Sequence, residues 1–141
     1  KGLYGLSYLE RLYFDDYQAI KWLNQQTEKP VILEAVGESY TDYSRVSANT
    51  GMSTVVGWPI HEWLWRDSYN VAAKRIDDVK DIYTSSDLIK TKNLLAKYNV
   101  RLVFVGTLEH QKYPGLKEDK FGKLGRIIFQ SGKTKIYQVT F

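Results

Sequence analysis

Residues 51–66 have the sequence GMSTVVGWPIHEWLWR, which contains three of the four tryptophans of the chain. The aromatic and ionisable side chains of this stretch are Trp58, His61, Glu62, Trp63, Trp65 and Arg66. A tryptophan buries a large apolar area but keeps a polar N–H that needs a partner. We therefore expect this stretch to be either buried or used in binding, with the rest of the chain arranged around it.

Short apolar runs on both sides of this stretch predict the strands of a sheet. Residues 31–35 (VILEA) and 101–105 (RLVFV) are mostly apolar and rich in β-branched side chains, as buried strands are. Residues 54–56 (TVV) predict a further short strand. Residues 125–130 and 134–141 predict a hairpin around a Ser-Gly-Lys turn.

Helices are predicted between these strands by apolar residues at helical spacing. The expected helical segments are residues 17–26, 45–50, 69–83, a helix capped by Ser86, and residues 116–121. Asp15 or Asp16 is expected to cap the first of them. Residues 37–45 and 107–113 are expected to be polar loops, each at the carboxyl end of a strand, where ligands bind in open α/β sheets.

Strands and helices alternate as far as residue 106, and the hairpin follows. This order predicts an α/β fold: a single layered domain with a mainly parallel sheet, flanking helices and a C-terminal antiparallel hairpin. The chain has 141 residues, which fits one soluble domain spanning residues 1–141 and is long enough to bury a core.

The composition excludes several classes of function. The net charge is +4, but lysine and arginine are scattered among acidic residues, so we expect no nucleic-acid partner. There is no cysteine, which excludes disulfides, thiolate metal sites and a cysteine nucleophile. No run approaches the roughly 18 apolar residues that cross a bilayer. Because the sequence begins at Lys1 and not at a methionine, we expect it to be a fragment of a longer chain.

Residues 37–39, Gly-Glu-Ser, follow a predicted strand and are similar to the Gly-Asp-Ser block of the SGNH hydrolases. That chemistry needs a histidine base near the C-terminus, usually three residues after an aspartate. The last histidine is His110, and Thr107 stands three residues before it, so this triad is incomplete. Ser39 with His61 is the remaining nucleophile and base for a free-standing hydrolase.

His61 and Glu62 could begin a zinc-binding helix, but the second histidine of that motif would fall at Trp65. A looser metal site would need Glu109 and His110 to meet them from another loop. The chain has neither a dinucleotide-binding glycine motif nor a phosphate-binding loop. We therefore predict no metal and no cofactor.

Arg45 and Arg66 are the cations that best suit an anionic ligand, because a guanidinium can bind a carboxylate or phosphate through two hydrogen bonds. The alternative is that each pairs with a nearby acid, Arg45 with Asp42 and Arg66 with Glu62. The tryptophans also leave two possibilities, which are packing in the core and stacking on a sugar or contacting a membrane surface.

Several longer stretches together resemble a known family. They are residues 16–24 (DYQAIKWLN), 31–35 (VILEA), 39–47 (SYTDYSRVS), 57–66 (GWPIHEWLWR), 95–100 (LAKYNV), 103–109 (VFVGTLE) and 120–121 (KF). They are similar to the C-terminal extramembrane region of the large "YYY" multipass membrane proteins of bacteria and archaea, the DUF2298 family. One departure is Ile60, where we would expect a glycine before the histidine.

The resemblance implies a role at a membrane. The family is similar to the GT-C class of integral-membrane glycosyltransferases, which take sugars from lipid-phosphate donors. In such enzymes the catalytic carboxylate usually belongs to a loop between transmembrane helices, and the C-terminal domain covers the active site or helps to recognise the acceptor. The resemblance implies that this chain is a C-terminal fragment on the extracytoplasmic face and is not catalytic by itself.

We therefore expect an accessory domain that assists recognition of a lipid-phosphate-sugar donor or an acceptor. Its expected partners are the transmembrane portion of the parent chain and a lipid-linked sugar phosphate or glycan acceptor. The expected substrate-binding residues are Tyr40, Asp42, Arg45, Trp58, His61, Glu62, Trp65 and Arg66. The alternatives are a structural or assembly domain without a ligand and a free-standing hydrolase.

Overall fold

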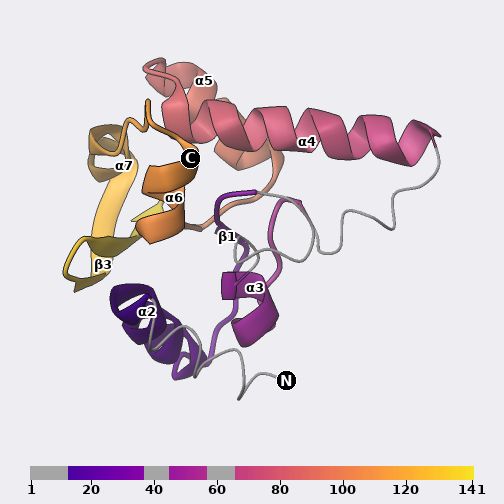
Figure 1. Ribbon diagram of the computed structural model, residues 1–141. Coiled ribbons are helices and arrows are strands. Elements are labelled where there is room, and N and C mark those ends of the chain that lie inside the picture. Colours follow the sequence, from indigo (N-terminus) through magenta and orange to yellow (C-terminus); the bar gives the residue numbers. More distant parts are fainter. Residues whose placement is uncertain (1–12, 37–44, 57–65) are drawn as a thin grey trace.

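A computed structural model describes residues 13–36, 45–56 and 66–141 of the chain (Figure 1). The elements in chain order are α2 (Phe14–Asn24), β1 (Ile32–Leu33), α3 (Arg45–Thr50), α4 (Arg66–Thr84), α5 (Leu88–Lys97), β2 (Leu102–Val105), α6 (Thr107–Lys112), α7 (Asp119–Leu124), β3 (Gly125–Ser131) and β4 (Thr134–Val139). Among the helices within these ranges, none is both long enough and apolar enough to span a bilayer.

The four strands form one sheet in the order β1-β2-β4-β3. β1 and β2 are parallel, whereas β4 is antiparallel to both of its neighbours, β2 and β3. The prediction of an α/β fold with a C-terminal hairpin is confirmed, but the prediction of a mainly parallel sheet is wrong. The hairpin makes up two of the four strands, and β4 pairs directly with β2, so the pairing of β1 with β2 is the one parallel pairing of this sheet.

The strand predicted at residues 54–56 does not form, which removes a second parallel partner. Val55 and Val56 are buried by their side chains, yet their backbone has no strand geometry. The carbonyl of Val55 accepts a hydrogen bond from Arg75 Nη1 of α4 at 3.1 Å. A side chain of the covering helix therefore binds a carbonyl that a neighbouring strand would otherwise bind.

Helices cover both faces of the sheet, because alternate strand residues point to opposite sides. Figure 1 shows α4 and α5 on one side of the sheet and α2 and α3 on the other. We call the first buried cluster the α4 core; its members include Leu33, Ile82, Tyr83, Leu95, Val103, Phe121 and Tyr137. The second, the α2 core, includes Ala19, Ile20, Leu23, Ile32, Val46, Leu102, Phe104 and Ile136.

Glycines fix both ends of the β3 strand. Gly132 has a φ of +58° in the turn to β4, a conformation that other L-residues rarely adopt. At Gly125, a Cβ atom would lie 1.7 Å from the carbonyl oxygen of Gln138 on β4, so only glycine allows the two strands to approach. The predicted hairpin thus forms with glycine where its geometry demands it.

Several helix boundaries and caps differ from the predicted ones. α2 begins after Tyr13, and Asp15 and Asp16 lie in its first turn without capping it. α5 is capped by Asp87 and not by Ser86. The polar loop predicted at residues 107–113 is mostly a helix, α6, in which Glu109 accepts a hydrogen bond from the Gly106 amide at 2.8 Å.

Candidate functional site

A buried arginine lies next to the carboxyl ends of the two parallel strands. Arg45 is the first residue of α3, and its side chain is only 2% exposed. Its Nη2 lies 2.7 Å from Glu109 Oε1 and 3.0 Å from Asp16 Oδ2. Its Nη1 donates to Glu109 Oε2 at 3.3 Å, and its Nε donates to Asp16 Oδ2 at 3.0 Å. The guanidinium carbon also lies 4.8 Å from the ring centroid of Phe104, which is a cation–π distance.

A third carboxylate, Glu34, follows β1 directly and completes what we call the Arg45 cluster: Arg45, Asp16, Glu34 and Glu109. Its Oε1 lies 3.6 Å from Arg45 Nη1, which is an ion pair without a hydrogen bond. Its two oxygens accept hydrogen bonds from the first free amides of α3, those of Val46 at 3.0 Å and Ser47 at 2.9 Å. Glu34 therefore acts as an N-terminal cap for α3 from a distance in the sequence.

The other two carboxylates also bind backbone groups of separate elements. Glu109 accepts from the amide of Ala35 at 2.8 Å, and Asp16 accepts from the amide of Thr107 at 3.2 Å. Asp16 also accepts from the hydroxyl of Thr134 on β4 at 2.6 Å. The Arg45 cluster thus joins α2, α3, α6, β4 and the end of β1 at one buried point.

The charges of the cluster act on each other in a buried site, where solvent screens them little. Burial alone would lower the pKa of Arg45, but the charges of Glu109 and Asp16 outweigh it and raise that pKa, so Arg45 stays protonated. Burial raises the pKa of the Glu34 carboxyl to about 7, although Arg45 and the α3 amides partly oppose the rise. The charge of Glu34 therefore depends on pH near neutrality.

The cluster also holds the chain on both sides of residues 37–44. Ala35 is tied to Glu109 through its amide, and the amide of Val36 donates to the hydroxyl of Tyr113 at 3.4 Å. Arg45, on the far side of residues 37–44, is tied to the same Glu109 carboxylate. One buried carboxylate therefore fixes both ends of the segment that was predicted to be a ligand-binding loop.

The structure describes the side chain of one of the eight predicted site residues, Arg45. Arg66 begins α4, and its side chain lies outside the described part of the chain, as do residues 37–44 and 57–65. The other predicted site residues, which all fall in those two ranges, are Tyr40, Asp42, Trp58, His61, Glu62 and Trp65. The predicted pairs of Arg45 with Asp42 and of Arg66 with Glu62, and the hydrolase pair Ser39 and His61, fall outside it too.

Sequence reasoning missed Asp16, Glu34 and Glu109 as partners of Arg45. Asp16 precedes Ala19, Ile20 and Leu23 by three, four and seven residues, so helical spacing places it on the buried face of α2. Glu34 interrupts an otherwise apolar strand run. A carboxylate on a buried face needs a partner, and that rule could have pointed to both residues.

Glu109 and His110 are adjacent in the sequence but belong to different sites. Glu109 is fully buried against Arg45, whereas His110 is 44% exposed and lies 3.7 Å from Glu118. Glu118 also lies 3.4 Å from Lys135 and accepts a hydrogen bond from the hydroxyl of Tyr137 at 2.8 Å. Within the described residues, no group of three or more histidine or acidic side chains is placed to hold a metal ion.

The described residues form a mixed α/β sandwich with an ionic cluster buried at the carboxyl ends of its parallel strands. No protein-family profile matches the chain, and no curated protein matches it. Among solved structures, it is similar to the C-terminal globular domain of an oligosaccharyltransferase from Archaeoglobus fulgidus, with a TM-score of 0.54 and 11% sequence identity. The match covers 87% of this chain and 95% of that one. At this identity the likeness shows a shared fold, and the resemblance to the "YYY" proteins is not shown by it.

Proposed function

We propose that this chain is an extramembrane accessory domain of an integral-membrane glycosyltransferase. In this role it assists recognition of a lipid-phosphate-sugar donor or of its acceptor and does not itself catalyse the transfer. The observation that carries the proposal is the fold, which is similar over 87% of the chain to a globular domain of an oligosaccharyltransferase. The sequence resemblance to GT-C-like membrane proteins supports the same class independently.

The proposal gives the Arg45 cluster a supporting role. Among the described residues, the Arg45 guanidinium donates its hydrogen bonds to Asp16 and Glu109, and the side chain is buried. We therefore place Arg45 beneath the ligand surface and not in contact with the ligand. Contact with the sugar phosphate is assigned to the remaining predicted residues: Tyr40, Asp42, Trp58, His61, Glu62, Trp65 and Arg66. Aromatic rings suit sugar faces, and a guanidinium suits a phosphate.

The proposal also implies a location and a protein partner. The transmembrane portion of the parent chain would carry the catalytic carboxylate, and this domain would lie against it on the extracytoplasmic face. The family resemblance supports both statements, and neither is needed for the binding test that follows.

The binding test uses the 141-residue chain and follows the indole N–H signals of its tryptophans by NMR. A water-soluble short-chain prenyl phosphate and a short glycan are titrated separately. We expect saturable shifts of the signals of Trp58, Trp63 and Trp65 with at least one of the two ligands. Arg66→Ala should abolish the response to the phosphate while the domain stays folded.

A matched control separates a specific site from general attraction to a basic protein. Arg126 is an exposed arginine on β3, and Arg126→Ala removes the same charge elsewhere. Its titration should equal that of the unmodified chain. Indole signals that do not move with either ligand, or a loss that is equal in both variants, would overturn the proposed binding role.

The same experiment tests the alternative of a structural domain without a ligand. The internal pairing of Arg45 favours that alternative for this residue, because an arginine that was expected to bind a ligand proves to bind only other parts of the fold among the residues described. Unmoved indole signals would extend that conclusion to the whole predicted surface and leave the domain as a scaffold for its parent protein.

A further inference from the structure

We infer that Glu34 is a proton-binding site built into the fold, which takes up one proton as the medium is acidified and makes the domain more stable. The inference concerns only described residues and does not rest on the proposed function. It follows from which of three buried carboxylates accept hydrogen bonds from the guanidinium of Arg45. Among the described residues, Arg45 is the cation of this cluster.

Two of the carboxylates bind nearly all of the guanidinium. Glu109 accepts from both Nη atoms, and Asp16 accepts from Nε and lies 3.0 Å from Nη2. Glu34 comes no closer to the guanidinium than 3.6 Å, and its hydrogen bonds come from two uncharged backbone amides. Since a cationic guanidinium donor stabilises an ionised carboxylate more than an uncharged amide donor does, Glu34 is the weakest-held charge of the three.

The Arg45 cluster has more carboxylates than cations, which favours a proton on one of its carboxyl groups. Three ionised carboxylates beside one guanidinium would leave two uncompensated charges in a buried site, and the partial positive charges of helix N-termini offset only part of this. A proton on Glu34 removes one of the two. The upward displacement of the Glu34 pKa to about 7 agrees with this geometry, with burial as its main cause.

Within the described residues, the charged and titratable groups that act on Glu34 are Arg45 of α3, Glu109 of α6 and Tyr83 of α4. Asp16 of α2 shares Arg45 with Glu34, and Tyr113 after α6 stacks on Tyr83. Burial raises the pKa of Tyr83 well above its ordinary value, so this phenol stays neutral in the range considered. Its hydroxyl donates to the carbonyl of Phe104 at 2.7 Å. Arg45 stays charged throughout, whereas the charge of Glu34 changes near neutral pH.

The direction of the effect follows from the raised pKa. The folded state holds the proton up to about pH 7, whereas in the unfolded chain the carboxyl has its ordinary pKa of 4.5. The stabilising contribution is therefore complete below pH 4.5 and is lost as the pH rises from there to about 7. Between pH 8 and pH 5.5 the folding equilibrium constant should increase about 25-fold from this group alone.

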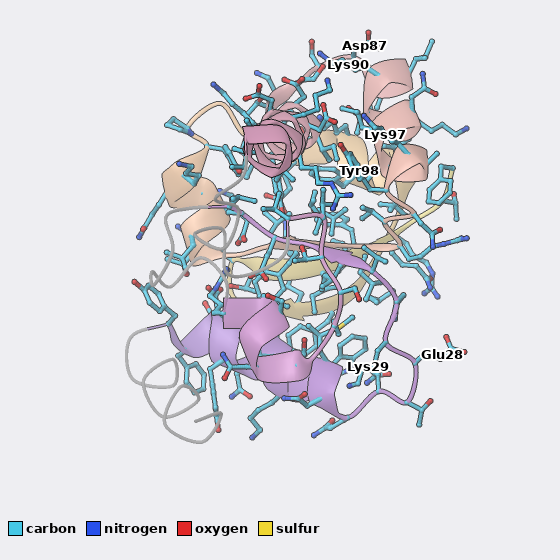
Figure 2. All side chains as sticks on the ribbon, turned by 90° about the vertical axis from the view of Figure 1, so that its right-hand side faces the viewer. Glu28, Lys29, Asp87, Lys90, Lys97 and Tyr98 are labelled. Carbon is cyan, nitrogen blue, oxygen red and sulfur yellow. The ribbon has the colours of Figure 1, made fainter. Side chains whose placement is uncertain are left out.

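The test measures this increase by urea unfolding at pH 5.5 and pH 8. Histidines ordinarily titrate in the same range, so every protein in the comparison carries His61→Gln and His110→Gln. Glu34→Gln in that background should reduce the change between the two pH values to less than about threefold. Glu28→Gln removes a carboxyl from an exposed side chain outside the cluster, which Figure 2 shows at the surface of the molecule, and should keep the full change.

A direct measurement keeps the inference falsifiable if Glu34→Gln does not fold. The side-chain carboxyl carbon of Glu34 is followed by NMR in the unmodified chain from pH 5 to pH 8.5. We expect its midpoint near pH 7, with the amide signals of Val46 and Ser47 moving at the same midpoint because they donate to Glu34. A carboxyl midpoint below pH 5, or unmoved amide signals, would overturn the assignment.

Discussion

At the scale of single residues, the central fact is that a buried arginine is held by carboxylates from three other segments. Glu109 binds it through both oxygens, at 2.7 Å and 3.3 Å, and both partners are buried. Each oxygen of Glu109 also accepts from a backbone amide, that of Gly106 or Ala35, so replacing one oxygen by an NH₂ group leaves buried N–H donors without an acceptor. The stability of the domain should therefore depend strongly on Glu109.

We predict that Glu109→Gln lowers the free energy of unfolding by about 3 kcal/mol, measured by urea denaturation at pH 7. Glu118→Gln is the matched control, since Glu118 has the same side chain and pairs with Lys135 nearer the surface. The control should lose about 1 kcal/mol or less. Equal losses of unfolding free energy in the two variants would show that the buried Glu109 matters no more to stability than the more exposed Glu118.

A second residue-scale prediction concerns Lys120, which is only 5% exposed. Its ammonium donates to the carbonyl of Ser85 at 2.5 Å and to the hydroxyl of Thr91 at 3.0 Å, which ties α7 to the corner between α4 and α5. Burial lowers the pKa of Lys120 to about 8 from its ordinary value of 10.5. The unfolded chain therefore binds the proton more tightly between these two pH values, and stability from this group rises with pH.

Lys120→Met should remove that dependence. From pH 8.0 to pH 9.5 the unmodified chain should gain about 1.5 kcal/mol of unfolding free energy relative to the variant, measured by urea denaturation at both pH values. The raised pKa of Tyr137, caused chiefly by burial, acts equally in both proteins and cancels in the comparison. A constant difference between them would mean that Lys120 has no lowered pKa.

The partners of Arg45 show why a site of this kind is hard to predict from sequence. Proximity along the chain favoured Asp42, whereas the observed partners Asp16 and Glu109 lie 29 and 64 residues away. Burial of Asp16 could be inferred from apolar spacing, whereas Glu109 lies in a stretch that was predicted to be a polar loop. Which acids lie next to Arg45 depends on the order of the strands in the sheet. That order was not predicted correctly, because a mainly parallel sheet was expected.

At the scale of elements, prediction succeeded where local rules are sufficient. The hairpin of β3 and β4 and the helix α4 follow from turn residues and from apolar spacing, and both form. The strand predicted at residues 54–56 does not form. A run of three residues has only a weak preference for strand geometry, and its backbone can bind a side chain such as that of Arg75 instead. The loop predicted at residues 107–113 is also wrong, because the polar sequence of residues 107–112 forms a helix in which Leu108 and Glu109 are buried.

The N-terminus of α5 gives an element-scale prediction. Asp87 Oδ1 accepts from the amides of Ile89 at 3.0 Å and Lys90 at 3.1 Å, and Figure 2 shows Asp87 and Lys90 together at this helix end. Asp87→Ala should lower the free energy of unfolding by about 1 kcal/mol in a urea titration. Ser86→Ala, which removes the cap expected from sequence, should change it by less than about 0.5 kcal/mol. The reverse order of the two losses would assign the cap to Ser86.

At the scale of the whole molecule, one thin sheet separates two cores. The α4 core and the α2 core meet through alternate residues of the same strands, such as Leu33 and Ile32 on β1. Neither core can lose its packing without exposing one face of that sheet. We therefore expect the two cores to unfold together, as one domain would.

Two matched leucines test this expectation. Leu23 in the α2 core and Leu95 in the α4 core are almost fully buried, whereas Leu88 on α5 is 36% exposed. Leu23→Ala and Leu95→Ala should each lower the free energy of unfolding by about 3 kcal/mol, and Leu88→Ala by less than about 1 kcal/mol. In each variant, the urea transitions by far-ultraviolet circular dichroism and by tryptophan fluorescence should coincide. Transitions that separate in Leu23→Ala but not in Leu95→Ala would mean that the α2 core unfolds alone, and the chain would then consist of two cooperative units that share a sheet.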